Sequence, residues 1–189
     1  MQRKLTQVEA GGGSLPNAPE LCTASKLRVR IGFWKKNWKP TLEQAREAAA
    51  GIARRDNLAA TQEDIDDAAN LYIFTRGIRD CDLALCEPLA QHAFETMRDD
   101  PTHTLVHRDW VQLLVHSHRA EDADAAALAY LEYMSGWNGA DVRTQNALGL
   151  WARLLRASRA ALPKSVAFFS ANFSPADLDD DGQPGTHAT

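Results

Sequence analysis

Two histidines of this chain have the spacing of a metal-binding pair. His103 and His107 are four residues apart, so on a helix both side chains point the same way. Zinc-binding pairs use this spacing, but a third ligand would have to come from His92 or Asp109, and no H-E-x-x-H element is present. We keep His103 and His107 as candidate metal ligands. The alternative, which we favour, is that they are partly exposed polar residues near a helix start, with no metal or cofactor bound.

A second candidate is the segment 33–40, which reads FWKKNWKP and combines aromatic with basic residues. Lysines that meet phosphates and tryptophans that stack on bases are typical of proteins that bind single-stranded nucleic acid. The same residue types suit a contact with another protein, and tryptophans four residues apart can also anchor the segment to a core. We favour core anchoring for the tryptophans, then a protein contact, then nucleic acid. The candidate partner-binding residues are Arg28, Arg30, Trp34, Lys35, Lys36, Trp38 and Lys39.

Charge is divided unevenly along the chain. Residues 1–60 contain 11 Lys or Arg and 5 Asp or Glu, a net charge of +6, whereas residues 61–189 contain 10 and 20, a net charge of −10. Clustered charge attracts an oppositely charged partner over about 8 Å at physiological salt. Affinity for duplex DNA rises with the number of phosphates neutralised, so the acidic remainder disfavours it. The pattern indicates a basic contact segment attached to an acidic body.

Motifs of known enzymes are incomplete or absent from the sequence. His107-Arg108-Asp109 matches only the first residues of a kinase catalytic loop, because Leu114 stands where the metal-binding Asn belongs. The sequence also has no G-x-S-x-G, no P-loop and no dinucleotide fingerprint. Its three cysteines lack disulfide or zinc spacing, and we expect them to be small buried side chains. We therefore lean towards a protein without catalytic activity.

Length and composition predict one domain with disordered ends. The chain has 189 residues, of which 44% are hydrophobic and 24% charged, values close to those of ordinary soluble domains. We predict a flexible leader over 1–24, a single helical domain over 25–173 and a disordered acidic tail over 174–189. The apolar runs are too short to span a bilayer and no secretory signal follows Met1, so we expect a cytoplasmic protein without membrane contact. Export without a signal stays open.

The pattern of one stretch near the N-terminus predicts a β-strand. Residues 26–33 alternate polar and apolar, with Leu27, Val29, Ile31 and Phe33 on one face, which is the period of a half-buried strand. We expect it to pair with residues 166–173, unless one of the two is a helical extension, or to accept a strand from a partner.

Almost everything between these stretches reads as helix. Capping residues Thr41 and Thr61 predict two helix starts, and Pro88 suits the first turn of a third helix. Further helices are expected over 103–119, 121–134 and 141–161 from their apolar periodicity. The fold class is therefore mainly α: a compact bundle of about six helices, or a stack of helical hairpins, with one or two short strands near the termini.

Taken together, these patterns favour a non-enzymatic adaptor, inhibitor or regulatory protein that binds another protein through the basic and aromatic segment. Its Ala-, Arg-, Asp- and Leu-rich composition favours a bacterial or mobile-element origin. One alternative is a nucleic-acid-associated regulator that uses the same Trp and Lys residues. Another is an enzyme without a recognisable motif, metal-dependent through the two histidines.

Overall fold

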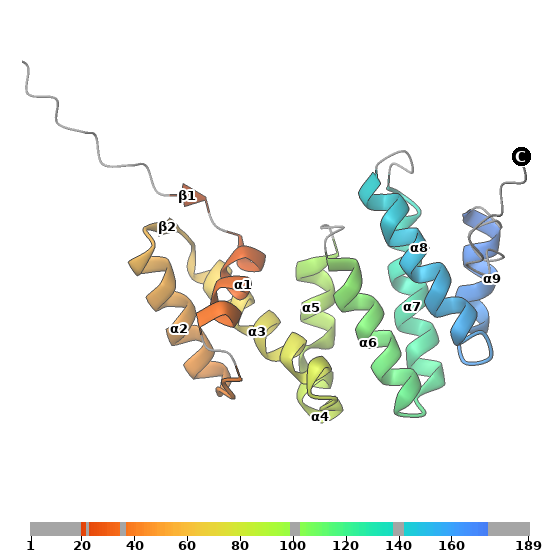
Figure 1. The fold of residues 1–189 in the computed structure, drawn as a ribbon, viewed down its shortest axis with the longest axis horizontal. Helices are drawn as coiled ribbons and strands as arrows, with labels where there is room; N and C mark the ends of the chain where they lie inside the picture. The colour runs from red at the N-terminus through yellow and green to blue at the C-terminus, as the bar shows by residue number, and fades with distance from the viewer. Residues whose placement is uncertain (1–19, 22, 35–36, 99–102, 138–141, 174–189) are drawn as a thin grey trace, which may run out of the picture.

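The computed structural model describes residues 20–21, 23–34, 37–98, 103–137 and 142–173, and over these ranges the chain is mainly α-helical (Figure 1). The mainly α fold class is thus confirmed. The elements in chain order are β1 (Glu20–Leu21), α1 (Ala24–Trp34), α2 (Leu42–Arg55), β2 (Leu58–Ala59), α3 (Gln62–Arg79), α4 (Leu83–Cys86), the short 3-10 helix η1 (Glu87–Leu89), α5 (Ala90–Met97), α6 (Thr104–His116), α7 (Ala120–Met134), α8 (Val142–Ala157) and α9 (Pro163–Asn172).

Two of the predicted helix starts are confirmed in atomic detail. At α2 the Thr41 hydroxyl accepts a hydrogen bond from the backbone N–H of Gln44, and the Gln44 side chain accepts one from the N–H of Thr41. The same reciprocal pair joins Thr61 and Asp64 at the start of α3. Each capping box satisfies two backbone donors that a helix start would otherwise leave unpaired.

The strand predicted over residues 26–33 is wrong, because this stretch forms helix α1. Leu27 and Ile31 are fully buried and point inward under either period, so they do not distinguish strand from helix. Val29 and Phe33 do distinguish them, since a strand would bury both with Leu27 and Ile31, whereas the helix turns them outward. The expected partner, residues 166–173, is also helical and belongs mostly to α9.

A short parallel pair replaces the predicted sheet. Glu20 pairs with Leu58 and Leu21 with Ala59, which ties the chain before α1 to the loop after α2. One short strand does lie near the N-terminus, as predicted, but with a different partner and at a different position. Two further differences concern helix bounds: Pro88 lies in η1, between α4 and α5, and the helix predicted over 141–161 already ends at Ala157, with Pro163 beginning α9.

The buried side chains form two clusters at the two ends of the molecule. The first is built mainly by α1, α2, α3 and α5, with single residues from β2, α4 and α6; Leu27, Leu71 and Met97 are fully buried in it. The second is built by α6, α7, α8 and α9 around Tyr130, Trp151 and Phe169. The chain reverses direction at each connection from α5 to α9, so the helices form a row along the long axis (Figure 1).

Trp110 on α6 joins the two clusters. Its ring lies 5.5 Å from that of Phe74 on α3, centroid to centroid, and it packs against both groups of buried residues. The one-domain prediction for 25–173 stays a prediction, and the predicted leader and tail lie outside the described residues apart from positions 20, 21, 23 and 24. No helix in the described part of the chain is long and apolar enough to cross a membrane.

Candidate functional site

A groove between α1 and α3 combines exposed apolar side chains with arginines. Its volume is about 620 Å³. The helical spacing of its α3 residues, i, i+3, i+4 and i+7, places them on one face. The lining residues are Arg28, Val29, Gly32, Phe33, Tyr72, Thr75, Arg76 and Arg79. The groove thus has an apolar wall from α1 and a basic wall from α3.

Phe33 is the most exposed large apolar side chain among the described residues. It is 83% exposed, and Val29, one turn earlier on the same helix, is 41% exposed. Full burial of a Phe or Val side chain stabilises a protein by about 1.5–3 kcal/mol relative to exposure. Single exposed apolar residues are common, but a pair at i and i+4 beside a groove forms a patch that another surface can cover.

Arg28 lies against the same groove, and no acidic residue in the described part of the chain forms an ion pair with it. Its Nε atom is inaccessible to solvent and has no hydrogen-bond partner among the described residues. Burial lowers the pKa of the Arg28 guanidinium from its ordinary value, since desolvation disfavours the charged form. A partly buried cation without an acidic partner costs free energy that the fold does not recover here.

At the end of α3 several cations share one carboxylate. Arg76 and Arg79 lie 3.2 and 3.4 Å from the Asp80 carboxylate, and Lys39 Nζ lies 4.0 Å from it. Burial acts to raise the pKa of Asp80, but hydrogen bonds from the two arginines outweigh it, so the pKa lies below its ordinary value. The wall of the groove therefore keeps a surplus of positive charge.

The other predicted contact residues lie in different surroundings. Arg30 is held in an ion pair with Asp56, 2.8 Å away, and hydrogen bonds from Arg55 and Arg30 lower the pKa of Asp56 to about 2. Trp38 is half-buried against the first cluster, with its ring 6.1 Å from that of Tyr72, as core anchoring predicted. The side chains of Trp34, Lys35 and Lys36 lie outside the described residues.

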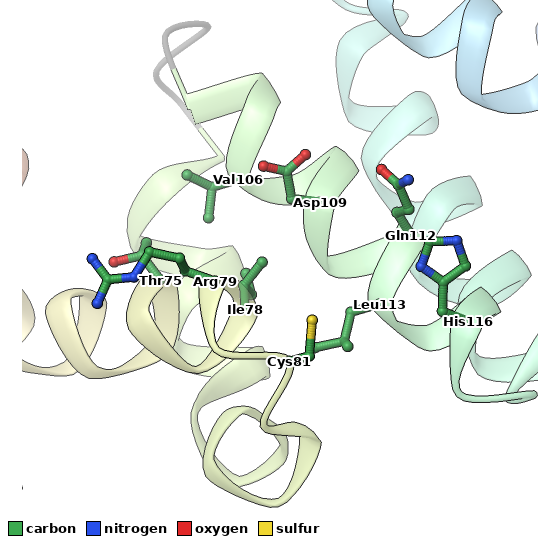
Figure 2. A pocket seen from close by; sticks show the side chains of 9 residues that line it. All are labelled: Thr75, Ile78, Arg79, Cys81, Val106, Asp109, Gln112, Leu113 and His116. Atoms are coloured by element: carbon green, nitrogen blue, oxygen red, sulfur yellow. The ribbon is translucent and has the colours of Figure 1, made fainter. Parts of the chain in front are cut away.

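A second hollow of about 380 Å³ separates α3 from α6 (Figure 2). It brings together Cys81, Asp109 and His116, residue types that can form a nucleophilic site. A nucleophile needs a base within hydrogen-bond reach, and no hydrogen bond joins these three side chains in the described structure; Asp109 instead accepts one from Arg108 at 2.6 Å. The three residues are therefore not assembled for catalysis.

Of the three cysteines predicted to be buried, Cys22 lies outside the described residues, and the prediction is right for one of the other two. Cys86 is buried, and its burial, together with Asp82 and Cys81, raises the pKa of its thiol to about 12. Cys81 is exposed and borders the α3–α6 hollow. It also ends α3 with a positive φ of 55°, the C′ position of a Schellman motif that usually carries glycine; the N–H of Asp82 bonds to the carbonyl of Gly77.

The two candidate metal ligands are core residues rather than partly exposed ones. His103 is 4% and His107 is 6% exposed. The His107 ring stacks on Tyr130 at 4.1 Å between centroids, and burial, with a smaller effect of His103, lowers the pKa of His107 to about 3. No group of three or more potential metal ligands occurs in the described ranges.

Asp124, part of the acidic stretch of α7, is also buried rather than solvated. Its carboxylate accepts hydrogen bonds from the backbone N–H groups of Lys164 and Ser165, at 3.0 and 2.9 Å, and from the Ser165 hydroxyl. These donors are in the first turn of α9, so Asp124 caps a helix from a different element. This buried charge is structural.

Comparison of the chain with models of known families, with curated proteins and with solved structures finds no match.

Sequence reasoning included Arg28 but missed most of the groove. Phe33 was assigned inward because the strand period was assumed, and Arg79 was not singled out because it lies far from the basic segment in sequence. Reading residues 24–34 with the helical period would have placed Leu27 and Ile31 inward and Val29 and Phe33 outward.

Proposed function

We propose that this protein is a non-enzymatic adaptor or regulator that binds another protein through the α1–α3 groove. The observation that carries the proposal is Phe33, which is 83% exposed on a regular helix beside a groove of about 620 Å³. Aromatic residues in protein interfaces supply a large share of the binding free energy when a partner covers them.

Arginines beside the aromatic residue support the same function. Arg28 and Arg79 border the groove near Phe33, and Arg together with aromatic residues is enriched at the centres of interfaces. Predicted contact residue Lys39 lies at the end of this wall, where it approaches Asp80. Arg30 and Trp38 hold the fold together in this proposal and contribute little to the contact.

Substitution of Phe33 tests the proposal. The wild-type protein is used as bait in a pull-down from lysates of cells that produce it naturally. We expect Phe33→Ser to capture none of the proteins that the wild type captures, because the apolar anchor is lost. Because the Phe33 side chain is largely exposed, its substitution should change the free energy of unfolding by less than about 0.5 kcal/mol. Urea unfolding of the same preparations checks this.

Leu105→Ser is the matched control. Leu105 is an exposed apolar residue on α6, 46% exposed, and lines none of the hollows described above. It should leave capture unchanged. Equal capture by wild type and Phe33→Ser would contradict the proposal. So would tight, salt-sensitive binding of a labelled single-stranded oligonucleotide that Phe33→Ser abolishes, because that result assigns the surface to nucleic acid.

A further inference from the structure

We propose that the occupant of the α1–α3 groove is an acidic segment of the partner protein, which lies along α3 and reaches the α3–α6 hollow beside Cys81. This inference rests on the proposed function, because it names the chemistry of what the groove binds. Charge and the continuity of the two hollows carry it.

Charge complementarity selects an acidic occupant. Nε of Arg28 is buried without a hydrogen-bond partner among the described residues. On the opposite wall Arg76, Arg79 and Lys39 share the carboxylate of Asp80, the one acidic group that pairs with them among the described residues. A partner carboxylate in the groove would supply the Arg28 guanidinium with the counter-charge that the described residues do not provide, and it would reduce repulsion among the cations. A basic segment would increase that repulsion.

The path of the occupant follows from two residues that border both hollows. Thr75 and Arg79 line the α1–α3 groove and also the α3–α6 hollow. Asp109, the acidic residue that lines the second hollow, is neutralised by Arg108. The two hollows therefore form one continuous surface along α3, and the negative charge at its far end is already paired.

The dimensions of the α1–α3 groove alone fit a short segment. Tyr72 and Arg79 mark the limits of the groove on α3 and are seven residues apart, a distance of about 10 Å at 1.5 Å per residue. Two turns of helix, or three to four extended residues, cover this distance. We therefore infer a motif with one apolar side chain against Phe33 and Val29 and carboxylates at Arg28 and Arg79.

Selection from a phage-displayed library of random 12-residue peptides, with the full-length protein as bait, tests the inference. Enriched peptides should contain Asp or Glu around an aromatic or aliphatic residue. A synthetic copy of the most enriched peptide should bind Arg28→Gln and Arg79→Gln each at least about tenfold more weakly than the wild type. Arg153→Gln, which changes an exposed arginine on α8, should bind normally.

Thiol labelling tests the path along α3. In a Cys22→Ser background, Cys81 is the exposed thiol, whereas Cys86 is buried. The bound peptide should slow the reaction of Cys81 with a maleimide about tenfold, because it covers the sulfur. An unchanged labelling rate with the peptide bound would overturn the path, and with it the inference as stated.

The remaining outcomes separate this inference from the proposed function. Enriched peptides that lack acidic residues but lose binding to Phe33→Ser would overturn the acidic occupant and leave the proposed function standing. A library that yields no peptide dependent on Phe33 would contradict both.

Discussion

The charged side chains of Arg28 and Asp124, at the two ends of the molecule, differ in whether their buried atoms have hydrogen-bond partners. At the α7–α9 end, Asp124 is buried and its carboxylate accepts three hydrogen bonds from the first turn of α9. At the α1–α3 end, Nε of Arg28 is buried with no such partner in the described ranges. A charge whose hydrogen bonds are satisfied internally serves the fold, whereas one left unsatisfied beside an exposed Phe is suited to an external partner.

Loss of the satisfied charge should have the largest effect on stability. Asp124→Ala removes a helix cap and leaves the N–H groups of Lys164 and Ser165 without an acceptor. We expect the free energy of unfolding to fall by about 3–4 kcal/mol, the sum of a lost cap and the desolvation of unpaired donors. Urea unfolding measures it.

Asp122→Ala is the control for that change. Asp122 lies two residues earlier on α7 and its side chain is 54% exposed, where it pairs with Arg119. Exposed pairs of this kind contribute at most about 1 kcal/mol. If both variants lost the same stability, the contrast between the satisfied and unsatisfied charges would lose its basis.

Acid should weaken the second cluster through His107. Its pKa is about 3 in the folded protein and 6.5 in the unfolded chain. Between these values the unfolded chain binds more protons, so the free energy of unfolding falls as the pH drops below 6.5 and is unaffected above it. At pH 4.5 we expect a loss of about 2–3 kcal/mol.

His107→Gln isolates this contribution from the carboxylates that also titrate. Unfolding of both proteins at pH 7 and pH 4.5 should show that the wild type loses about 2–3 kcal/mol more than the variant on acidification. Equal losses for wild type and His107→Gln would mean that His107 is protonated in the folded state.

Removal of the Arg28 charge should raise the free energy of unfolding, whereas removal of the Asp124 charge should lower it. Arg28→Met keeps a long apolar side chain and removes the desolvated cation, so we expect the free energy of unfolding to rise by about 1 kcal/mol. Arg30→Met on the same helix removes the ion pair with Asp56 and should not stabilise the protein. If Arg28→Met destabilised the protein more than Arg30→Met, Arg28 would be structural and the proposed binding surface would lose its main cation.

The sequence supported the helical class and several helix starts because capping and periodicity are local signals. Thr41 and Thr61 act through residues three positions away, so their roles could be predicted without tertiary information. For residues 26–33 the local pattern does not decide between strand and helix. Leu27 and Ile31 are compatible with both periods, and what decides is the tertiary contact of α1 with α3, two helices later in the chain.

The candidate site was predictable only in part for the same reason. Arg28 stood out through the basic composition of the first 60 residues, whereas Arg79 and Thr75 join it only through folding. Burial of His103, His107 and Asp124 also depends on contacts with other helices, which local patterns do not specify. Polarity alone predicted partial exposure for the two histidines, whereas the packing of the helices buries them.

Packing between helices that follow closely along the chain has a consequence for how the protein reaches this structure. The main contacts join α1 with α3, α2 with α3, α6 with α7 and α7 with α9, so most partners are near one another in sequence. Chains with such local contacts lose little loop entropy before they gain stabilising contacts, and small proteins of this type fold within microseconds to milliseconds. Stopped-flow or temperature-jump kinetics on this chain should therefore find folding at the fast end of the range for its size.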